Sequence, residues 1–449
     1  MDLIIDKNKI YLKEVKSYLI ILLMILTCIF KLEILAFILM AIYILDYIND
    51  KEFMIKYAYV IFLICSNIGG VLAIELSKSS FYLYEIAQMT YQSGALGPII
   101  LAQMITLEGI KIFERKYGKK VKCNKFCFTG KSIKYICIGI IFIMSIMLLK
   151  VINKPFFMFG YDRFAYQKDI LSSIEIKIGN MLLWLSPLFY ILIKNKNKKL
   201  GILGIILFNF YFFWIGHKFS LFFMGFQLGF IVLVDNIDYI NLKKYFTKLI
   251  KIFVVMIVAV SFQSIVVQGR SFSENIDYFK VRLAQQGQLW WGVYKEDNYH
   301  NLHLDEAKKE AELFFTLKED EKLKYNLGMF KVMRLVAPNS IVDAKINQGS
   351  RYAYSTQASI LYYFNYPILI VFNLFLGIGL AYITNLFIKY INEKNVIGVI
   401  LLAKLWVTYT RMLSNSDFDT IFSLENVVII FILIFIKILP RKKLIIKYN

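Results

Sequence analysis

The chain has 449 residues, of which 58% are hydrophobic and only 19% are charged, and its formal net charge is +21. The mean hydropathy of +0.57 is well above that of a water-soluble domain, so a soluble enzyme is excluded. Because the lysines lie between apolar segments rather than on one soluble face, lipid head groups explain the positive charge better than nucleic acid does.

Apolar segments recur along the chain, and each is long enough, at roughly 15 to 22 residues, to cross a hydrocarbon core about 30 Å thick. Charged residues separate them into twelve expected helices, at residues 17–31, 34–48, 55–76, 88–107, 135–153, 178–193, 200–215, 219–235, 250–268, 361–384, 396–412 and 424–440. The first two are short enough to form a single bent hairpin. The sequence therefore predicts an all-α, polytopic integral membrane protein with about twelve transmembrane helices.

Lysine and arginine are concentrated in alternate connectors, beginning with the N-terminal segment. Positive residues are retained on the cytoplasmic side of a membrane, so we expect both termini to be cytoplasmic. The scheme divides the chain into three parts. Residues 1–268 hold helices one to nine and a short outer loop at 154–180, residues 269–360 form an outer loop domain, and residues 361–449 hold helices ten to twelve.

The outer loop domain has 92 residues and is nearly balanced in charge, with 13 basic and 12 acidic residues. Within it, residues 304–324 place Ala307, Ala311, Phe314 and Phe315 on one face of a helix whose opposite face is charged. This pattern predicts a long helical outer loop. A cap that lies on the bilayer surface is the alternative to a catalytic role for this helix.

Arginine is rare in this chain, with only eight among 53 basic residues, yet six of the eight fall on the expected outer side. They are Arg163, Arg270, Arg282, Arg334, Arg351 and Arg411. A guanidinium group grips phosphate oxygens in pairs, which the ammonium group of lysine does not. We therefore expect a phosphate or pyrophosphate site at the outer leaflet. Pairing with acidic side chains or with lipid head groups is the alternative, and the apolar neighbours of Arg334 indicate a structural pairing there.

The segment from Gly269 to Trp291 concentrates polar chemistry at the start of the outer loop. If it is helical, one face carries Arg270, Glu274 and Asp277, and a neighbouring face carries Tyr278, Arg282 and Gln286. Two cations and two carboxylates would then lie close together.

Three glutamines stand beside two tryptophans in this segment. Gln285, Gln286 and Gln288 offer amide hydrogen bonds, and Trp290 and Trp291 offer flat apolar surfaces, a combination that suits a sugar ring. A belt of aromatic residues at the membrane interface is the alternative interpretation of the two tryptophans.

All three histidines fall on the expected outer side. His217 lies with Lys218 in a tight turn between two spans, and His300 and His303 lie in the long loop. Each is a candidate proton carrier, and a solvated side chain is the alternative. Lys404 is the one charged residue deep within an expected span, and we expect it to pair with an acid on another helix or to extend toward the cytoplasm.

The pattern of about twelve spans, cytoplasmic termini, a long outer loop late in the chain and outward arginines resembles a known bacterial family. It is similar to the O-antigen and capsule polymerases of the Wzy type, which join lipid-linked oligosaccharide repeat units, and to the related O-antigen ligases. In residues, the resemblance rests on Gly216–Ser220 (GHKFS) and on Gly269–Trp291.

The resemblance implies a glycosyltransferase that polymerises undecaprenyl-pyrophosphate-linked repeat units at the outer face of the cytoplasmic membrane. The expected catalytic residues are Arg270, Arg282, Glu274, Asp277, His300 and His303, and the choice of general base among the acids and histidines stays open. The expected substrate-binding residues are Arg163, Arg351, Arg411, His217, Lys218, Gln285, Gln286, Gln288, Trp290 and Trp291.

The expected partners are the undecaprenyl-pyrophosphate-linked oligosaccharide, the lipid bilayer, a flippase and a regulator of chain length, without nucleic acid, cofactor or metal. Two alternatives remain. A ligase would transfer the finished chain to another acceptor, and a flippase or exporter of lipid-linked glycan would carry charged residues along a central path through the membrane.

Overall fold

The computed structural model describes residues 2–48, 50–77, 82–117, 130–156, 163–194, 197–217, 219–234, 269, 271–295, 302–316, 328–348, 350–393, 395–414 and 423–438, together with the single residues 251, 258 and 265. The helices expected as spans are α1 (Asp2–Ile29), α2 (Glu33–Ile48), α3 (Lys51–Leu76), α4 (Leu96–Tyr117), α5 (Gly130–Val151), α7 (Ser173–Leu185), α8 (Pro187–Lys194), α9 (Lys198–Trp214), α10 (Phe219–Leu233), α18 (Ser355–Asn392), α19 (Val396–Arg411) and α20 (Leu424–Ile438).

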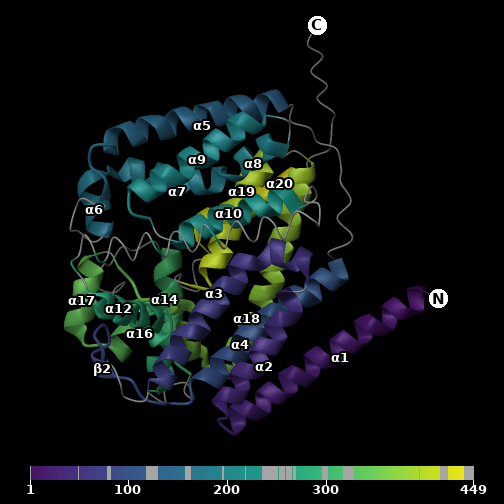
Figure 1. The fold of residues 1–449 in the computed structure, drawn as a ribbon, viewed down its shortest axis with the longest axis vertical. Helices are drawn as coiled ribbons and strands as arrows, with labels where there is room; N and C mark the ends of the chain where they lie inside the picture. Colours follow the sequence, from purple (N-terminus) through teal and green to yellow (C-terminus); the bar gives the residue numbers. More distant parts are fainter. Residues whose placement is uncertain are drawn as a thin grey trace.

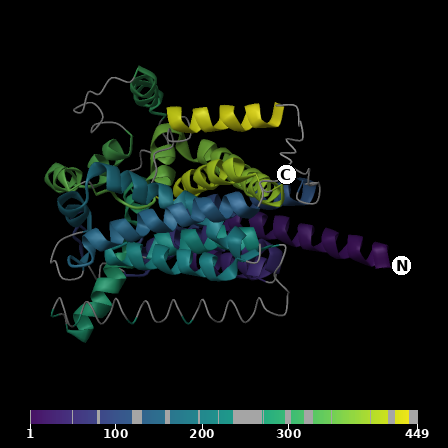
Figure 2. The same ribbon diagram turned by 90° about the horizontal axis from the view of Figure 1, so that it is seen from above.

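The remaining elements lie in the segments expected outside the membrane. They are the antiparallel hairpin of β1 (Tyr82–Leu83) and β2 (Gln88–Met89), and the helices α6 (Arg163–Ile170), α12 (Phe272–Ala284), α13 (Gln288–Lys295), α14 (Leu304–Thr316), α16 (Gly328–Val336) and α17 (Asn339–Asn347). We call these the outer elements. Figure 1 shows α6, α12, α14, α16, α17 and the hairpin gathered at the left, at the end of the helix bundle opposite the N-terminus, and Figure 2 shows the same separation from above.

The all-α prediction is confirmed, apart from the short hairpin, and the apolar helices are compatible with a membrane protein. The described residues hold five helices that are long and apolar enough to cross a membrane: 52–76, 96–117, 132–151, 173–194 and 355–392. Shorter apolar helices cover 15–29, 220–233 and 424–436. The count of twelve spans is not confirmed, because the described part shows fewer and the expected span at 250–268 lies almost entirely outside it.

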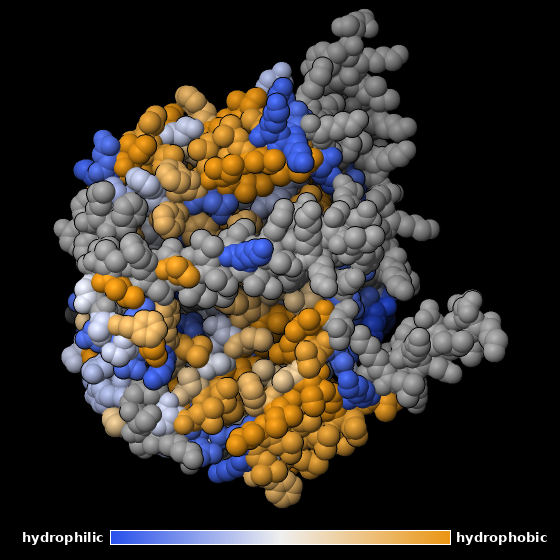
Figure 3. Space-filling model, in the orientation of Figure 1, coloured by the Kyte–Doolittle hydropathy of each residue, from blue (hydrophilic) through white to orange (hydrophobic). Residues whose placement is uncertain are grey.

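Large apolar side chains cover much of the molecular surface. In Figure 3 they form continuous areas over α5 and α9 at the top and over α1 and α2 at the lower right, whereas the outer elements at the lower left are mostly pale or blue. Exposed examples are Leu22 in α1, Phe142 in α5 and Phe431 in α20. Side chains of this kind are expected where helices face lipid rather than water.

The prediction of a span at 88–107 was wrong at both ends. Residues 88–95 form β2 and an irregular turn, and α4 begins only at Leu96. The carboxylate of Glu75 holds this turn, because it accepts the backbone N–H groups of Ser93 at 2.9 Å, Gly94 at 3.3 Å and Ala95 at 3.2 Å. The helix then continues to Tyr117, well past the expected end.

The longer α4 carries three charged residues into the helix bundle: Glu108, Lys111 and Glu114. From the sequence, these residues were expected in a connector. Glu108 accepts a hydrogen bond from the hydroxyl of Tyr43 at 2.6 Å and lies 3.2 Å from the Lys111 ammonium group. Glu114 lies 3.2 Å from the ammonium group of Lys56 in α3. Lys404 is therefore not the one deep charge in the chain.

Lys404 pairs with Glu425, the second residue of α20, and its ammonium group lies 4.5 Å from the ring centroid of Trp184. The expectation that Lys404 pairs with an acid on another helix is confirmed. Such pairing is what makes a charged side chain tolerable within a bundle of apolar helices.

Helix α7 begins at Ser173, five residues before the start expected for this span at residue 178. Ser172 and Glu175 form a reciprocal capping box, in which each side chain accepts the backbone N–H of the other residue. This cap starts the helix earlier than the apolar residues alone would indicate.

Helices α4 and α18 pack closely against each other. A methyl group added at Gly109 would overlap the carbonyl oxygen of Leu374, and one added at Gly377 would overlap that of Thr106. Small residues at a helix crossing allow the backbones to approach, which is how membrane helices gain packing without a hydrophobic driving force.

The outer elements are packed onto the ends of these helices. Helix α12 contacts α3, and α13 contacts α3, α16 and α18. Helix α18 itself begins at Ser355, inside the segment assigned to the outer loop, and bends at Asn365, which has a φ of 66°, two residues before Pro367. The outer loop is therefore continuous with the bundle.

Candidate functional site

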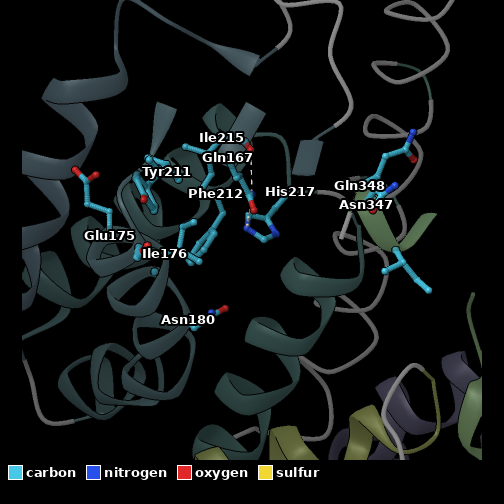
Figure 4. Close-up of a pocket in the computed structure, with 14 residues that line it drawn as sticks. Gln167, Glu175, Ile176, Asn180, Tyr211, Phe212, Ile215, His217, Asn347 and Gln348 are labelled. Carbon is cyan, nitrogen blue, oxygen red and sulfur yellow. Dashed lines mark hydrogen bonds between the residues drawn. The ribbon is translucent and has the colours of Figure 1, made fainter. Parts of the chain in front are cut away.

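A cavity of about 520 Å³ opens between α6, α7, α9 and α17, where the outer elements meet the bundle (Figure 4). It is lined by Gln167, Leu171, Ser173, Glu175, Ile176, Gly179, Asn180, Tyr211, Phe212, Ile215, His217, Ile346, Asn347 and Gln348. A half-apolar cavity with a few polar groups directed into it is typical of a small-molecule site.

Local structure fixes the walls of this cavity. The hydroxyl of Tyr166 in α6 donates to the carbonyl oxygen of Lys154, and burial raises the pKa of Tyr166, so the group remains a donor. The turn after α9 requires Gly216, because its φ of 82° lies in the left-handed region and a side chain there would overlap the ring of Phe156. This turn presents His217 to the cavity.

The imidazole of His217 lies in the middle of the cavity, with Phe212 on one side (Figure 4). On the other side are Asn347, the last residue of α17, and Gln348, the residue after it. Its Nε2 atom is 3.2 Å from the side-chain amide nitrogen of Gln167, and the ring of Phe212 stands edge-on to it at 5.1 Å. The imidazole is therefore held in one orientation by an amide and an aromatic ring.

The other polar groups of the lining are mostly amides and hydroxyls. Asn180 projects from α7, and the buried hydroxyl of Tyr211 has no hydrogen-bond partner among the described residues. Glu175 points away from His217 in Figure 4, because its carboxylate caps α7 and binds the ammonium group of Lys150 at 2.7 Å. Among the described lining residues there is no lysine or arginine.

This lining matches the chemistry of a sugar more closely than that of a phosphate. Amides both donate hydrogen bonds to hydroxyl groups and accept hydrogen bonds from them, which suits the hydroxyl groups of a sugar. The described lining thus offers hydrogen-bonding amides and no cation.

The outer arginines whose side chains are described do not line this cavity. Arg282 is exposed, and its guanidinium donates to the hydroxyl of Tyr278 at 2.9 Å and to Gln285 at 3.0 Å. Arg351 lies 5.6 Å from the ring centroid of Phe330, and Arg411 is the last residue of α19. None of these three lines the cavity.

Four predicted site residues lie outside what the structure describes, wholly or in their side chains. Lys218, Arg270 and His300 are not described, and Arg163 is described only as the first residue of α6, one turn before Gln167.

Arg270 of the predicted charged face lies outside the described residues, whereas the two carboxylates of that face are described. Glu274 closes a capping box with Ser271, and Asp277 pairs with the ammonium group of Lys280 at 3.1 Å, with both side chains exposed. These carboxylates are occupied by local contacts, because α12 begins right after Arg270 and Glu274 falls at the capping position.

The second predicted face of α12 is confirmed. Besides the bond from Arg282 to Tyr278, the side-chain amide of Gln286 donates to the carbonyl oxygen of Arg282 at 3.2 Å. Away from this face, His303 stacks on Tyr362 with ring centroids 4.3 Å apart, and it does not line the cavity.

The two tryptophans are not a surface for a sugar ring. Trp290 and Trp291 are completely buried, and their indole N–H groups donate to the carbonyl oxygens of Ala95 at 3.0 Å and Tyr91 at 3.3 Å. Gln288 is also buried and donates to the carboxylate of Glu85. These side chains instead form the core between α13 and the hairpin region, because α13 inserts among α3, α16 and α18.

Arg334 pairs with Asp343 at 2.6 Å and with Asn339 at 3.2 Å, which confirms the expected structural pairing. Arg334→Gln is expected to lower the free energy of unfolding by only about 0.5 to 1 kcal/mol, because Asp343 is more than half exposed. Thermal unfolding in detergent measures this loss. If the Arg334–Asp343 ion pair causes this loss of stability, Asp343→Asn lowers the free energy of unfolding by a similar amount, and the double variant lowers it little further. Additive losses in the double variant would contradict this assignment.

Sequence reasoning missed most of the cavity. The lining comes from α6, α7, α9 and the end of α17, and no sequence spacing connects its polar residues, which are Gln167, Asn180, Tyr211, Asn347 and Gln348. Among the cavity residues, the sequence pointed only to His217, because His217 lies in a tight turn between two apolar segments.

Comparisons with known proteins add one finding. A model of DUF6418, a family of unknown function, matches residues 322–430, which include α16 to α19 and thus Asn347 and Gln348 of the cavity. No curated protein and no solved structure matches the chain. Within the described residues, no group of three or more His, Cys, Asp or Glu side chains is placed to hold a metal ion.

Proposed function

We propose that this protein is a membrane glycosyltransferase that polymerises undecaprenyl-pyrophosphate-linked oligosaccharide repeat units at the outer face of the bacterial cytoplasmic membrane, with both termini cytoplasmic. The observation that carries the proposal is the cavity at the outer end of the bundle, with its amides, its unpartnered Tyr211 hydroxyl and one oriented imidazole. A sugar bound there would lie at the level where a lipid-linked oligosaccharide emerges from the bilayer.

In the reaction, the bond between the anomeric carbon of the donor sugar and its pyrophosphate breaks, and the acceptor hydroxyl oxygen forms the new glycosidic bond. The pyrophosphate leaves with the bonding electron pair. The hydroxyl proton passes to the imidazole of His217, which Gln167 holds in place. His217 thus replaces Glu274, Asp277 and His303 as the base, since the described contacts leave those three outside the cavity.

The leaving pyrophosphate requires positive charge beside the sugar site. Three cations stand next to lining residues in the chain. Arg163 comes one helical turn before Gln167, Lys218 follows His217, and Arg351 comes three residues after Gln348. We assign the pyrophosphate to these three cations from their places in the sequence; Arg351 stands near the lining residue Gln348 in the chain but does not itself line the cavity.

An exporter of lipid-linked glycan is the second candidate, and the charged residues in α4 favour it. Those charges are paired, however. Glu108 binds Tyr43 and Lys111, and Glu114 binds Lys56 and accepts a hydrogen bond from Asn385 at 2.7 Å. Paired charges between helices support a structural role.

Reconstitution tests the proposal. Cells that lack this gene would supply their own lipid-linked single repeat units, which are then added to liposomes that contain the purified protein. We expect longer lipid-linked chains on a gel, with one undecaprenyl pyrophosphate released for each unit added. Transfer only to a different lipid acceptor would indicate a ligase. Movement of the units across the bilayer without a new bond would indicate an exporter, and either result would overturn the proposal.

A further inference from the structure

Helix α12 carries an apolar stripe that the described part of the fold leaves partly exposed. Phe272, Ile276, Phe279 and Leu283 follow one another at i, i+4, i+7 and i+11, so they share one face of the helix. Their side chains are 74%, 43%, 36% and 43% exposed. Asn275 and Ala284, on other faces of the helix, are buried. Figure 2 shows α12 as the teal-green helix at the lower left margin of the molecule.

The depth of α12 follows from its contacts with α3. The turn after α12 lies against the outer part of α3, where the amide of Asn67 donates to the carbonyl oxygen of Gln286 at 2.8 Å and Gly70 meets Gly287 backbone to backbone. Because α3 ends at Leu76 and a helix rises 1.5 Å per residue, these contacts lie about 9 to 14 Å below its outer end. The C-terminal end of α12 is therefore level with the last turns of a helix that is long enough to cross the membrane.

The charges on α12 are arranged around the stripe. At 100° per residue, Lys280 lies on one side of the stripe and Arg282 on the other, and both side chains are exposed. Asp277 pairs with Lys280, which leaves Arg282 as the cation on the opposite side. Basic side chains that flank an apolar face extend their charged ends toward lipid phosphates while their stems cover hydrocarbon.

From the depth of α12, its apolar stripe and the position of its charges, we propose that α12 is an interfacial helix. Its apolar stripe lies among the acyl chains of the outer leaflet, with Lys280 and Arg282 at the head-group phosphates. The partner is the lipid surface itself. The inserted turn at Gln285–Gly287 is tolerated at this depth because the polar carbonyl group of Gln286 is satisfied by Asn67 and is shielded by protein. The proposal does not depend on the glycosyltransferase activity.

Spin labelling tests it. All five cysteines are first replaced, and single cysteines are then introduced by Ile276→Cys and Phe279→Cys on the stripe and by Asp277→Cys on the charged side as the matched control. Each labelled variant must elute as one species in size-exclusion chromatography before it enters liposomes of phosphatidylethanolamine and phosphatidylglycerol. The collision rates of each label with oxygen, which concentrates in lipid, and with a water-soluble nickel chelate are measured.

We expect the two stripe labels to collide at least several-fold more with oxygen than with the nickel chelate, and the label at position 277 to show the reverse. Stripe labels that collide mainly with nickel would place the stripe in water and overturn the proposal. Stripe labels that are shielded from both reagents and broadened by spin coupling would show a second copy of the chain on this face, which would also overturn it.

Discussion

Gly377→Leu is expected to prevent the protein from folding into a single species. A side chain at this position would overlap the backbone of α4 at Thr106, and backbone atoms cannot move aside as a flexible side chain can. We expect a loss of about 3 kcal/mol or more, a large part of the usual stability of a protein. Fluorescence-detected size-exclusion chromatography of a tagged variant measures the loss as a collapse of the main peak.

Gly139→Leu is the matched control for this prediction. Gly139 lies in α5, where a methyl group would meet no atom within 4 Å, so the same substitution is expected to leave the elution profile unchanged. A normal profile for Gly377→Leu would contradict the close packing of α4 on α18. Equal losses in both variants would indicate an effect on expression rather than on helix packing.

His217→Ala is expected to reduce the rate of chain elongation by a factor of roughly 100 to 10,000, which is the usual contribution of a positioned general base. The readout is the length distribution of lipid-linked glycan in the reconstituted system, followed over time. Binding of the substrate should change much less than the rate, because the amides of Asn180, Asn347 and Gln348 remain in the cavity.

His303→Ala is the matched control, because His303 stacks on Tyr362 and does not line the cavity. We expect this variant to elongate chains at close to the normal rate once its folding has been verified. The opposite ranking of the two histidines, with His303→Ala inactive and His217→Ala active, would move the reaction from the cavity to the surface between α14 and α18.

The approximate positions of the apolar helices could be predicted because apolar length is a local property of the sequence. Their ends could not, since these depend on contacts between distant residues. The start of α4 is set by Glu75, which lies about twenty residues earlier and holds the turn before the helix. Likewise, the charges of α4 are tolerated inside the bundle only because Tyr43 and Lys56 on other helices bind them.

The candidate site could be predicted only where one residue stood in a distinctive local setting. His217 met that condition through the turn at Gly216, and Arg334 through its apolar neighbours. Trp290 and Trp291 were misplaced because an aromatic pair next to glutamines has the same composition in a sugar site and in a core. The two tryptophans belong to a core here because α13 inserts between helices that lie far away in the chain.

The bend of α18 at Asn365 has a mechanical consequence. The segment before the bend is held by α14 and α16, through the contact of His303 with Tyr362 and the hydrogen bond from the backbone of Gly328 to Tyr363. The segment after it is fixed to α4 at Gly377. Pro367 has no N–H group and therefore leaves one helical hydrogen bond unmade at the bend. The segment of α18 before Asn365 can therefore tilt relative to the segment after it. The first turns of α18 and the outer elements that contact them can thus tilt while the packing of α18 on α4 stays unchanged.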